Sequence, residues 1–408
     1  MKDLDLNFVR SQFYAFDADN ALCQKAFFEN AGGSFPCKFV VDKLTKFYET
    51  TKVQPYGHFN GSIEAGEEMD KSIEKLAKLL RIPTNNLHVG PSTSQNTYVL
   101  ANALRLSKIK KKVIIVSNQD HESNTGVWRN LAGQGFEIRE WRVRSNGSLY
   151  LDDLKNLIDS TVCMIAFPHV SNIIGQVNPV KEICTLAKEV GAFTCVDGVS
   201  YAPHGIPQIN DFNPDIYLFS SYKTFGPHLG VMYVSDELAL ELESQCHYFN
   251  KEYPNKRFTP AGPDHAQVSA LGGIYDYYEA VSNHHLSREL SFDSSINEIN
   301  GLIAKQEKKT LKPLLDFLKT KRDVRLLGSY ETEDRVPTVA IVTKKSNVAL
   351  AKQLNELDIS VGVGDFYAVR LLEALDVDIN EGVTRLSFVH YTSGSDVEKL
   401  ISGLDRYL

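Results

Sequence analysis

Short apolar runs bounded by polar residues recur along the middle of the chain, and segments with helical spacing, such as 180–190, lie between some of them. A parallel sheet flanked by helices produces this alternation, because its strands are buried on both faces and read as continuous apolar runs. The pattern predicts an α/β fold whose main sheet is mostly parallel and doubly wound. Its expected strands are residues 113–116, 162–167, 193–196 and 216–219.

Polar residues follow each of these runs directly. In an open α/β sheet, ligands bind outside the carboxyl ends of the strands. We therefore expect the polar groups after the four strands to meet in one crevice. They are residues 118–124, 169–172, Asp197 and 220–223.

The pattern changes after about residue 285. Ser395 and Glu398 have the spacing of a capping box and predict the start of a last helix. The strand–helix–strand–helix order predicts a small α+β domain packed on the larger one. The elements expected before that last helix are a polar helix over 291–321, a strand over 335–343, a helix over 347–357 and a strand over 384–391.

These patterns divide the chain into two expected domains. The large α/β domain is expected over residues 25–285, and the small domain over 286–408 together with residues 1–24. A chain of 408 residues is long enough for two such domains and for a sizeable core.

Composition narrows the class of protein. A formal net charge of −7 and the absence of a long basic stretch argue against a nucleic-acid groove, which is built on phosphate neutralisation. The longest stretch without a charged residue, 161–180, contains prolines and polar residues, so we expect no membrane span. The start of the chain lacks the apolar core of a signal peptide, and we expect a cytoplasmic location. The six cysteines lack metal-ligand spacing and predict reduced, buried thiols and no metal site.

Lys223 and Asp197 are the first candidates for chemistry. Lys223 directly follows an apolar run, where a free ammonium would be costly to bury, whereas a lysine held as a Schiff base suits carbonyl chemistry. Asp197 also ends an apolar run and needs a cationic partner, which the pyridinium nitrogen of pyridoxal phosphate (PLP) would provide. The alternatives are a lysine that extends its charge to solvent and an aspartate that caps a turn.

Three further features fit the same cofactor. His121 could lie flat on the cofactor ring or be an ordinary packed histidine. Asn172 could donate to the ring hydroxyl or simply occupy a turn. The segment GPSTSQN begins a helix, where backbone amides with the hydroxyls of Thr93 and Ser94 would bind a phosphate, or where Ser and Thr only cap the helix.

Further motifs occur in a fixed order along the chain: FENAGGS, PSTSQN, DHESN, FPHVSNIIGQVNP, CVDGVSYAPHG, SSYKTFGP and TRLSFVHYTS. Together they resemble the class V aminotransferase family of PLP enzymes, and within it the cysteine desulfurase branch. The ordered set of His121, Asp197 and Ser-x-x-Lys ending at Lys223 is the specific part of the match. The resemblance implies the fold of type I PLP-dependent transferases, PLP as cofactor, a small amino acid as substrate and a homodimer with shared active sites.

The resemblance also implies roles for individual residues. Lys223 forms the Schiff base and moves the Cα proton, Asp197 pairs with the pyridine nitrogen, and His121 stacks on the ring. Arg385 binds the substrate carboxylate, with Asn172 between cofactor and substrate. Further implied contacts are the phosphate ligands Thr93, Ser94 and Ser220, the cofactor neighbours Ser200 and Tyr222, and Gly262 with His265 near the partner's cofactor.

The chain departs from the family pattern at three places. Tyr222 stands where the family commonly has histidine, and Ser200 stands where it commonly has glutamine or histidine. The loop that carries the nucleophilic cysteine of the desulfurases reads VGVGDFYAVRLL here and contains no thiol, which leaves Cys37 as a remote substitute. A β-elimination needs no such thiol, and Tyr367 or His58 could then act near the leaving group or simply form a wall.

Three hypotheses follow. The first is a carbon–sulfur β-lyase or desulfurase-like enzyme acting on cysteine or a related small amino acid. The second is an aminotransferase or epimerase that uses the same cofactor, because the fold does not decide which bond breaks. The third is a non-catalytic dimeric scaffold, against which Lys223, Asp197, His121 and Arg385 argue.

Overall fold

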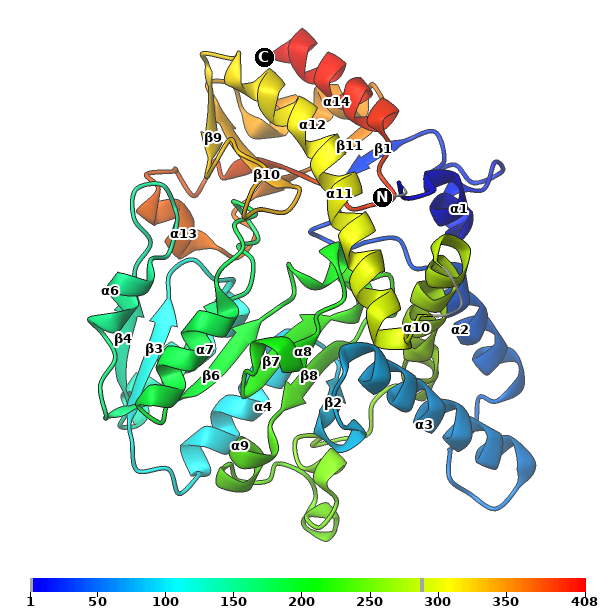
Figure 1. The fold of residues 1–408 in the computed structure, drawn as a ribbon, viewed down its shortest axis with the longest axis vertical. Coiled ribbons are helices and arrows are strands. Elements are labelled where there is room, and N and C mark those ends of the chain that lie inside the picture. Colours follow the sequence, from blue (N-terminus) through cyan, green and yellow to red (C-terminus); the bar gives the residue numbers. More distant parts are fainter. Residues whose placement is uncertain (1–2, 287–289) are drawn as a thin grey trace.

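The computed structural model describes residues 3–286 and 290–408 and contains two β-sheets with helices packed around them (Figure 1). The larger sheet has seven strands in the order β2-β8-β7-β6-β5-β3-β4. Only β8 runs antiparallel to its neighbours, so the sheet is mostly parallel, as predicted. Its strands are β2 (Leu87–Gly90), β3 (Val113–Ser117), β4 (Glu137–Trp141), β5 (Val162–Pro168), β6 (Phe193–Asp197), β7 (Ile216–Ser220) and β8 (Gly230–Val234).

Successive residues of the central strands face two separate cores, which makes the sheet doubly wound. Ile114 of β3 packs in one core with helices α4 and α5, and Ile115 packs in the other with α3, α7 and α10. The α/β prediction is therefore confirmed, and the four expected strands are β3, β5, β6 and β7. The helices of this part are α2 (Lys38–Thr50), α3 (Asn60–Leu80), α4 (Thr93–Leu106), α5 (Gly126–Arg129), α6 (Leu151–Lys155), α7 (Val180–Glu189), α8 (Ile209–Phe212), α9 (Asp236–Glu241) and α10 (His265–His285).

The smaller sheet has five strands in the order β1-β11-β12-β10-β9 and packs with α11 and α14 around its own apolar core (Figure 1). Its strands are β1 (Ala26–Phe28), β9 (Val324–Leu327), β10 (Thr338–Thr343), β11 (Ile359–Gly364) and β12 (Val383–Ser387). The remaining helices are α1 (Leu6–Ser11), α11 (Phe292–Lys319), α12 (Asn347–Asn355), α13 (Val369–Ala374) and α14 (Gly394–Tyr407).

β1 joins the smaller sheet although its residues fall in the range expected for the large domain. It runs parallel to β11, with Ala26 opposite Ile359. The first strand in the sequence therefore completes a sheet formed otherwise by the last third of the chain. The division of the chain into domains of residues 25–285 and 286–408 stays a prediction; residues 1–2 and 287–289 of its ranges lie outside the described residues.

The start of the last helix was predicted two residues too late. Ser393, not Ser395, caps α14: its Oγ accepts from the Asp396 N–H at 3.1 Å, and an Asp396 carboxylate oxygen accepts from the Ser393 N–H at 2.8 Å. Asp396 also pairs with Arg10, which fixes its carboxylate at this end of the helix. Ser393 with Asp396 has the same spacing as Ser395 with Glu398, and the ion pair between Asp396 and Arg10 favours the first.

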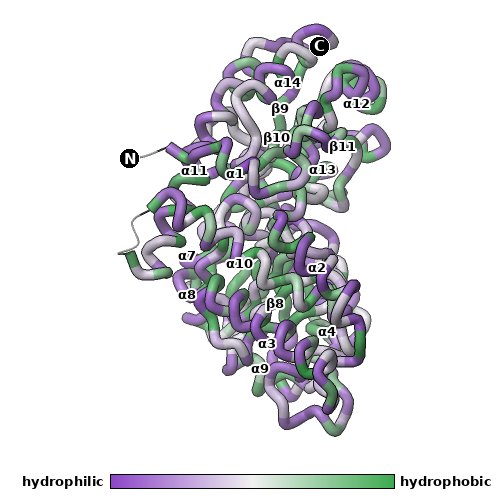
Figure 2. The backbone as a smooth tube through the Cα atoms, turned by 90° about the vertical axis from the view of Figure 1, so that its right-hand side faces the viewer, coloured by the Kyte–Doolittle hydropathy of each residue, from purple (hydrophilic) through white to green (hydrophobic). Residues whose placement is uncertain are grey.

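Hydrophilic and hydrophobic residues alternate along outer helices such as α2 and α3 (Figure 2). In α3, Leu76, Leu79 and Leu80 are buried, whereas Lys78 between them is exposed. This is the pattern of helices that cover a sheet with one face. Among the described residues, no helix is long and apolar enough to cross a membrane.

Candidate active site

A cavity of about 170 Å³ lies at the carboxyl ends of β5, β6 and β7, beside the first residues of α4. This is the crevice that the polar residues after the strands predict. Its lining includes nine of the expected site residues: Thr93, Ser94, His121, Asn172, Asp197, Ser200, Ser220, Tyr222 and Lys223.

One end of the cavity is suited to an anion. Ser92 caps α4, its Oγ accepting from the Gln95 N–H at 3.1 Å, and the Thr93 and Ser220 hydroxyls lie 2.8 Å apart. The free amides at the start of this helix, with the adjacent hydroxyls, form the type of site that binds phosphate. Gly230 of β8 allows the turn to lie this close, because a Cβ there would collide with the Ser92 carbonyl group.

Lys223 and Asp197 face the same cavity and have displaced pKa values. Burial, followed by the nearby charge of Arg385, lowers the pKa of Lys223 to about 8, against the opposing effect of Asp197. Burial raises the pKa of Asp197 to about 6, against a hydrogen bond from the Val199 N–H to its Oδ1 at 2.8 Å. That bond is the turn cap considered above, and it uses one carboxylate oxygen. The other, Oδ2, makes no hydrogen bond or ion pair within the described part of the chain, so the site fits a cationic ring nitrogen.

His121 presents a neutral ring to the cavity. Its Nδ1 accepts from the Ser123 N–H at 3.0 Å and lies 2.8 Å from the Ser123 hydroxyl. Burial, together with the charges of Lys223 and Arg385, lowers the pKa of His121 to about 3. An uncharged, fixed imidazole is suited to packing against a flat cofactor ring.

Sequence reasoning missed Asp120, although it directly precedes His121. Its Oδ1 accepts from the His121 N–H at 2.8 Å, and its Oδ2 accepts from Asn124 Nδ2 at 2.8 Å. Burial, followed by the charge of Asp197, raises the pKa of Asp120 well above its usual range. His228, also missed, stacks on Tyr222 with ring centroids 4.5 Å apart.

Arg385 lies on β12 at the junction of the two sheets, and its side chain is only 3% exposed. Its Nη1 donates to the Asn172 carbonyl at 3.2 Å, and its Nη2 pairs with Glu29 Oε1 at 2.9 Å. The Phe366 ring covers the guanidinium, with Cζ 3.6 Å from the ring centroid. Glu29 was not predicted, because the two partners of this pair are far apart in sequence.

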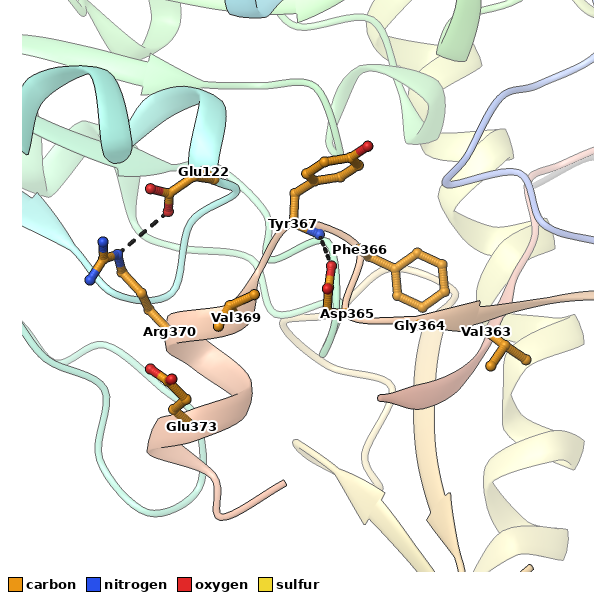
Figure 3. Close-up of a pocket in the computed structure, with 9 residues that line it drawn as sticks. All are labelled: Glu122, Val363, Gly364, Asp365, Phe366, Tyr367, Val369, Arg370 and Glu373. Carbon is orange, nitrogen blue, oxygen red and sulfur yellow. Dashed lines mark hydrogen bonds and ion pairs between the residues drawn. The ribbon is translucent and has the colours of Figure 1, made fainter. Parts of the chain in front are cut away.

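The loop after β11 contacts several residues of the site, and Figure 3 shows its side chains from Asp365 to Tyr367. Phe366 and Tyr367 both have left-handed backbone conformations, with φ of 52° and 57°, and Asp365 Oδ1 accepts from the Tyr367 N–H at 2.7 Å. The Tyr367 ring lies 5.2 Å from that of His121. The Phe366 carbonyl accepts from Asn172 Nδ2 at 2.9 Å, and the Tyr367 carbonyl accepts from the Glu122 N–H at 2.8 Å. The loop thus contacts both the segment after β5 and the segment after β3.

Asn172 retains one free polar atom in the site. Its Nδ2 is used by the loop, and its Oδ1 is buried without a hydrogen-bond partner among the described residues. Because an unpartnered buried amide oxygen is unfavourable, the position fits a hydroxyl or ammonium donor from a bound molecule.

Several expected residues lie outside this cavity. Tyr367 is 70% exposed and lines an outer cavity of about 720 Å³ with Glu122 and Arg370 (Figure 3). His58 is exposed just before α3. Gly262 and His265 line a third cavity of about 430 Å³.

The cysteines do not supply a thiol at the loop. Cys37 is fully buried, donates its S–H to the Gly273 carbonyl at 3.5 Å, and has its pKa raised to about 12 by burial. A thiol that remains protonated is a poor nucleophile. In the parts of the chain that the structure describes, no group of three or more His, Cys, Asp or Glu side chains could hold a metal ion.

A family model described as aminotransferase class-V matches residues 26–278, more than half of the chain. An aminotransferase-like protein FGM3 of Gibberella zeae is 28% identical over 98% of this chain and 98% of its own length. A cysteine desulfurase of Pectobacterium carotovorum is 24% identical over 93% of this chain and 92% of its own. The apo structure of a cysteine desulfurase from Thermococcus onnurineus NA1 superimposes with a TM-score of 0.85 at 22% identity, over 100% of this chain and 98% of that one.

Proposed function

The chain belongs to the aminotransferase class-V family of PLP-dependent enzymes, and we propose that it is a β-lyase that acts on cysteine or a related small amino acid. One observation carries the choice of reaction. The loop after β11, at the place where the sequence resemblance puts the nucleophilic thiol, has Phe366 and Tyr367 packed against Arg385 and His121. Release of a leaving group from Cβ requires no thiol there.

The residues of the cavity fit PLP. Thr93, Ser94 and Ser220 would hold the phosphate at the start of α4, and Asp197 would pair with the ring nitrogen. Lys223 would hold the cofactor covalently through Nζ. Asn172 Oδ1 would accept a hydrogen bond from a polar group of the cofactor or the substrate. Ser200 and Tyr222 would complete the wall of the cofactor site.

When bound, PLP supplies an acceptor for the electron pair left by bond cleavage at Cα. Lys223 takes the proton from Cα, a task for which a pKa of about 8 leaves part of the amine neutral near physiological pH. Arg385 holds the substrate carboxylate and so orients the Cα–H bond. The Phe366 ring shields the contact between Arg385 and this carboxylate from water. We assign protonation of the leaving group to the Tyr367 hydroxyl, whose ring lies in the outer cavity, 5.2 Å from that of His121.

We further propose a homodimer in which each chain contributes to the partner's site. Exposed aromatic side chains lie at or near the cavity that Gly262 lines: Tyr56 lines it, Phe59 is three residues further along the chain, and Tyr248 directly follows His247, which also lines it. Large exposed apolar residues grouped in this way are typical of an interface. In the dimer, Gly262 and His58 would approach the partner's cofactor and substrate.

The reaction is tested by incubating the PLP-loaded protein with L-cysteine and identifying the products by mass spectrometry. Equal amounts of pyruvate, ammonia and sulfide are expected. Alanine with sulfur transferred to the protein would contradict a β-lyase and would indicate a desulfurase that uses another thiol. No turnover of L-cysteine would exclude cysteine as the substrate and favour a different amino acid or amino transfer. Amino transfer is the second candidate, favoured by the similarity to an aminotransferase-like protein along nearly the whole chain. A 2-oxo acid added with the amino acid would then be converted to a new amino acid.

A further inference from the structure

Glu29 lies beside β12, close to Arg385. It directly follows β1 and forms an isolated bridge with Ser387 of β12, two residues after Arg385. Gly362 of β11 is directly opposite Arg385, and a Cβ at that position would collide with the Glu29 carboxylate. Gly32 leaves similar room on the other side, since a Cβ there would lie 2.6 Å from Glu29 Oε1. The two glycines thus leave a passage that the Glu29 side chain fills.

Arg385 and Glu29 each keep one polar atom without a hydrogen-bond partner. Arg385 is almost fully buried, and its Nε has no hydrogen-bond partner among the described residues. Glu29 uses Oε1 for the pair, whereas its Oε2 is buried and without a partner in the described chain. The Glu29 side chain is 27% exposed against 3% for Arg385, so the glutamate is the partner with room to move.

A buried guanidinium requires a counter-charge, because leaving it unpaired is strongly unfavourable. A substrate carboxylate bound to Arg385 would supply that charge, but it would then lie close to the carboxylate of Glu29. Two carboxylates at one guanidinium repel each other, especially where water is excluded. Binding of the substrate carboxylate and retention of the Glu29 contact therefore oppose each other.

We propose that Glu29 is a specificity-determining residue: it is the counter-ion of Arg385 in the substrate-free protein and is displaced by the α-carboxylate of the amino-acid substrate. This inference rests on the proposed role of Arg385 in substrate binding. A molecule with a carboxylate alone gains too little to displace Glu29. An amino acid gains a second attachment through its amine and does displace it, so the pair selects for molecules that carry both groups.

The test compares the wild type with Glu29→Gln, which keeps the size of the side chain and removes its charge. Glu140→Gln is the matched control, because Glu140 is 25% exposed and pairs with Arg129, outside the inner cavity, at 2.6 Å. Binding of L-alanine and of L-alaninamide, which lacks the carboxylate, is followed by the change in absorbance of the PLP-loaded proteins. We expect E29Q to bind L-alanine about tenfold more tightly and L-alaninamide unchanged, and to unfold at a lower temperature than the wild type. E140Q should bind both molecules as the wild type does.

Weaker binding of L-alanine by E29Q would show that Glu29 only positions Arg385 and would overturn the inference. An equal change in the binding of L-alanine and L-alaninamide would also overturn the inference. The cofactor-free proteins provide an independent comparison, in which sodium propionate supplies a carboxylate without an amine. Propionate should raise the unfolding temperature of E29Q but not that of the wild type, and an equal response would contradict the exchange. A wild type that forms no coloured complex with PLP would instead contradict the proposed function, and the propionate comparison would still decide the role of Glu29.

Discussion

Lys223 and Asp197 differ in charge, yet burial disfavours the charged form of both. It lowers the pKa of the lysine to about 8 and raises that of the aspartate to about 6. Neither group has an ion-pair partner within 4.0 Å among the described residues. Two buried ionisable groups in one cavity, both lacking a partner, are typical of a site that is completed by a ligand.

Replacing Lys223 with alanine should abolish covalent attachment of PLP, because no other side chain in the inner cavity carries a primary amine. The measurement is reduction of the PLP-loaded protein with borohydride, followed by mass spectrometry of its peptides. The control is Lys188→Ala, at the end of α7. A modified peptide that persists in K223A would show that a different lysine holds the cofactor.

Asp197 should make the stability of the cofactor-free protein depend on pH. Its pKa is 3.8 for an ordinary aspartate and about 6 in the folded protein, so the folded state binds this proton more tightly than the unfolded state. The contribution of protonated Asp197 to the free energy of unfolding is therefore fully present below about pH 4 and is lost as the pH rises through about 6. By linkage, the loss amounts to about 3 kcal/mol.

Asp197→Asn should remove that loss while it weakens PLP binding. Urea unfolding of the cofactor-free proteins between pH 4 and 7 provides the measurement. Asp153→Asn is the control, because the pKa of this exposed carboxyl is lowered by Arg144, which gives the opposite dependence on pH. Equal pH dependence in the wild type and D197N would show that Asp197 is not the group responsible.

The residues that the sequence could predict are those next to a strand end or a helix start. Thr93, Asp197 and Lys223 each follow directly from such a local signal. Glu29 could not be predicted in this way, since its partner Arg385 is brought near only by the pairing of β1, β11 and β12. The role of Phe366 likewise depends on a tertiary contact.

At the scale of elements, β8 positions the start of α4. Gly230→Ala should displace the turn at Ser92, because the added methyl group collides with its backbone. We expect PLP affinity to fall at least about tenfold while the fold persists, since the strain is local and costs about 1–3 kcal/mol. Titration of PLP by absorbance is the measurement, with Gly133→Ala, where a Cβ meets open space, as the control. Unchanged affinity in G230A would place the phosphate elsewhere.

Four of the seven strands of the larger sheet were predicted; β2, β4 and β8 were not, although β8 is a central, buried strand. The runs that became β3, β5, β6 and β7 are central strands, buried on both faces, and their sequences show it. The short edge strands β1 and β2 have three and four residues. Segments of that length carry little periodicity, so pairing partners far away in the chain decide their structure.

At the scale of the whole molecule, the proposed dimer can be tested directly. The wild type should have the mass of two chains in light scattering. Phe59→Glu combined with Tyr248→Glu should yield single chains, because both side chains are exposed, close in sequence to Tyr56 and His247 of the Gly262 cavity, and would bring charges into the interface. Val348→Glu, an exposed position on α12, is the control. A single-chain mass for the wild type would contradict the dimer.

The place of β1 in the smaller sheet also has a consequence for synthesis on the ribosome. Ala26 emerges early, but its partner Ile359 is made only near the end of translation. At about 5–20 residues per second, β1 remains without its partner strand for roughly 15 to 70 s. The smaller sheet therefore cannot form cotranslationally, and nascent chains that stop before β11 expose an unpaired apolar strand at their oldest end. Such chains are natural targets for chaperones that bind close to the exit tunnel.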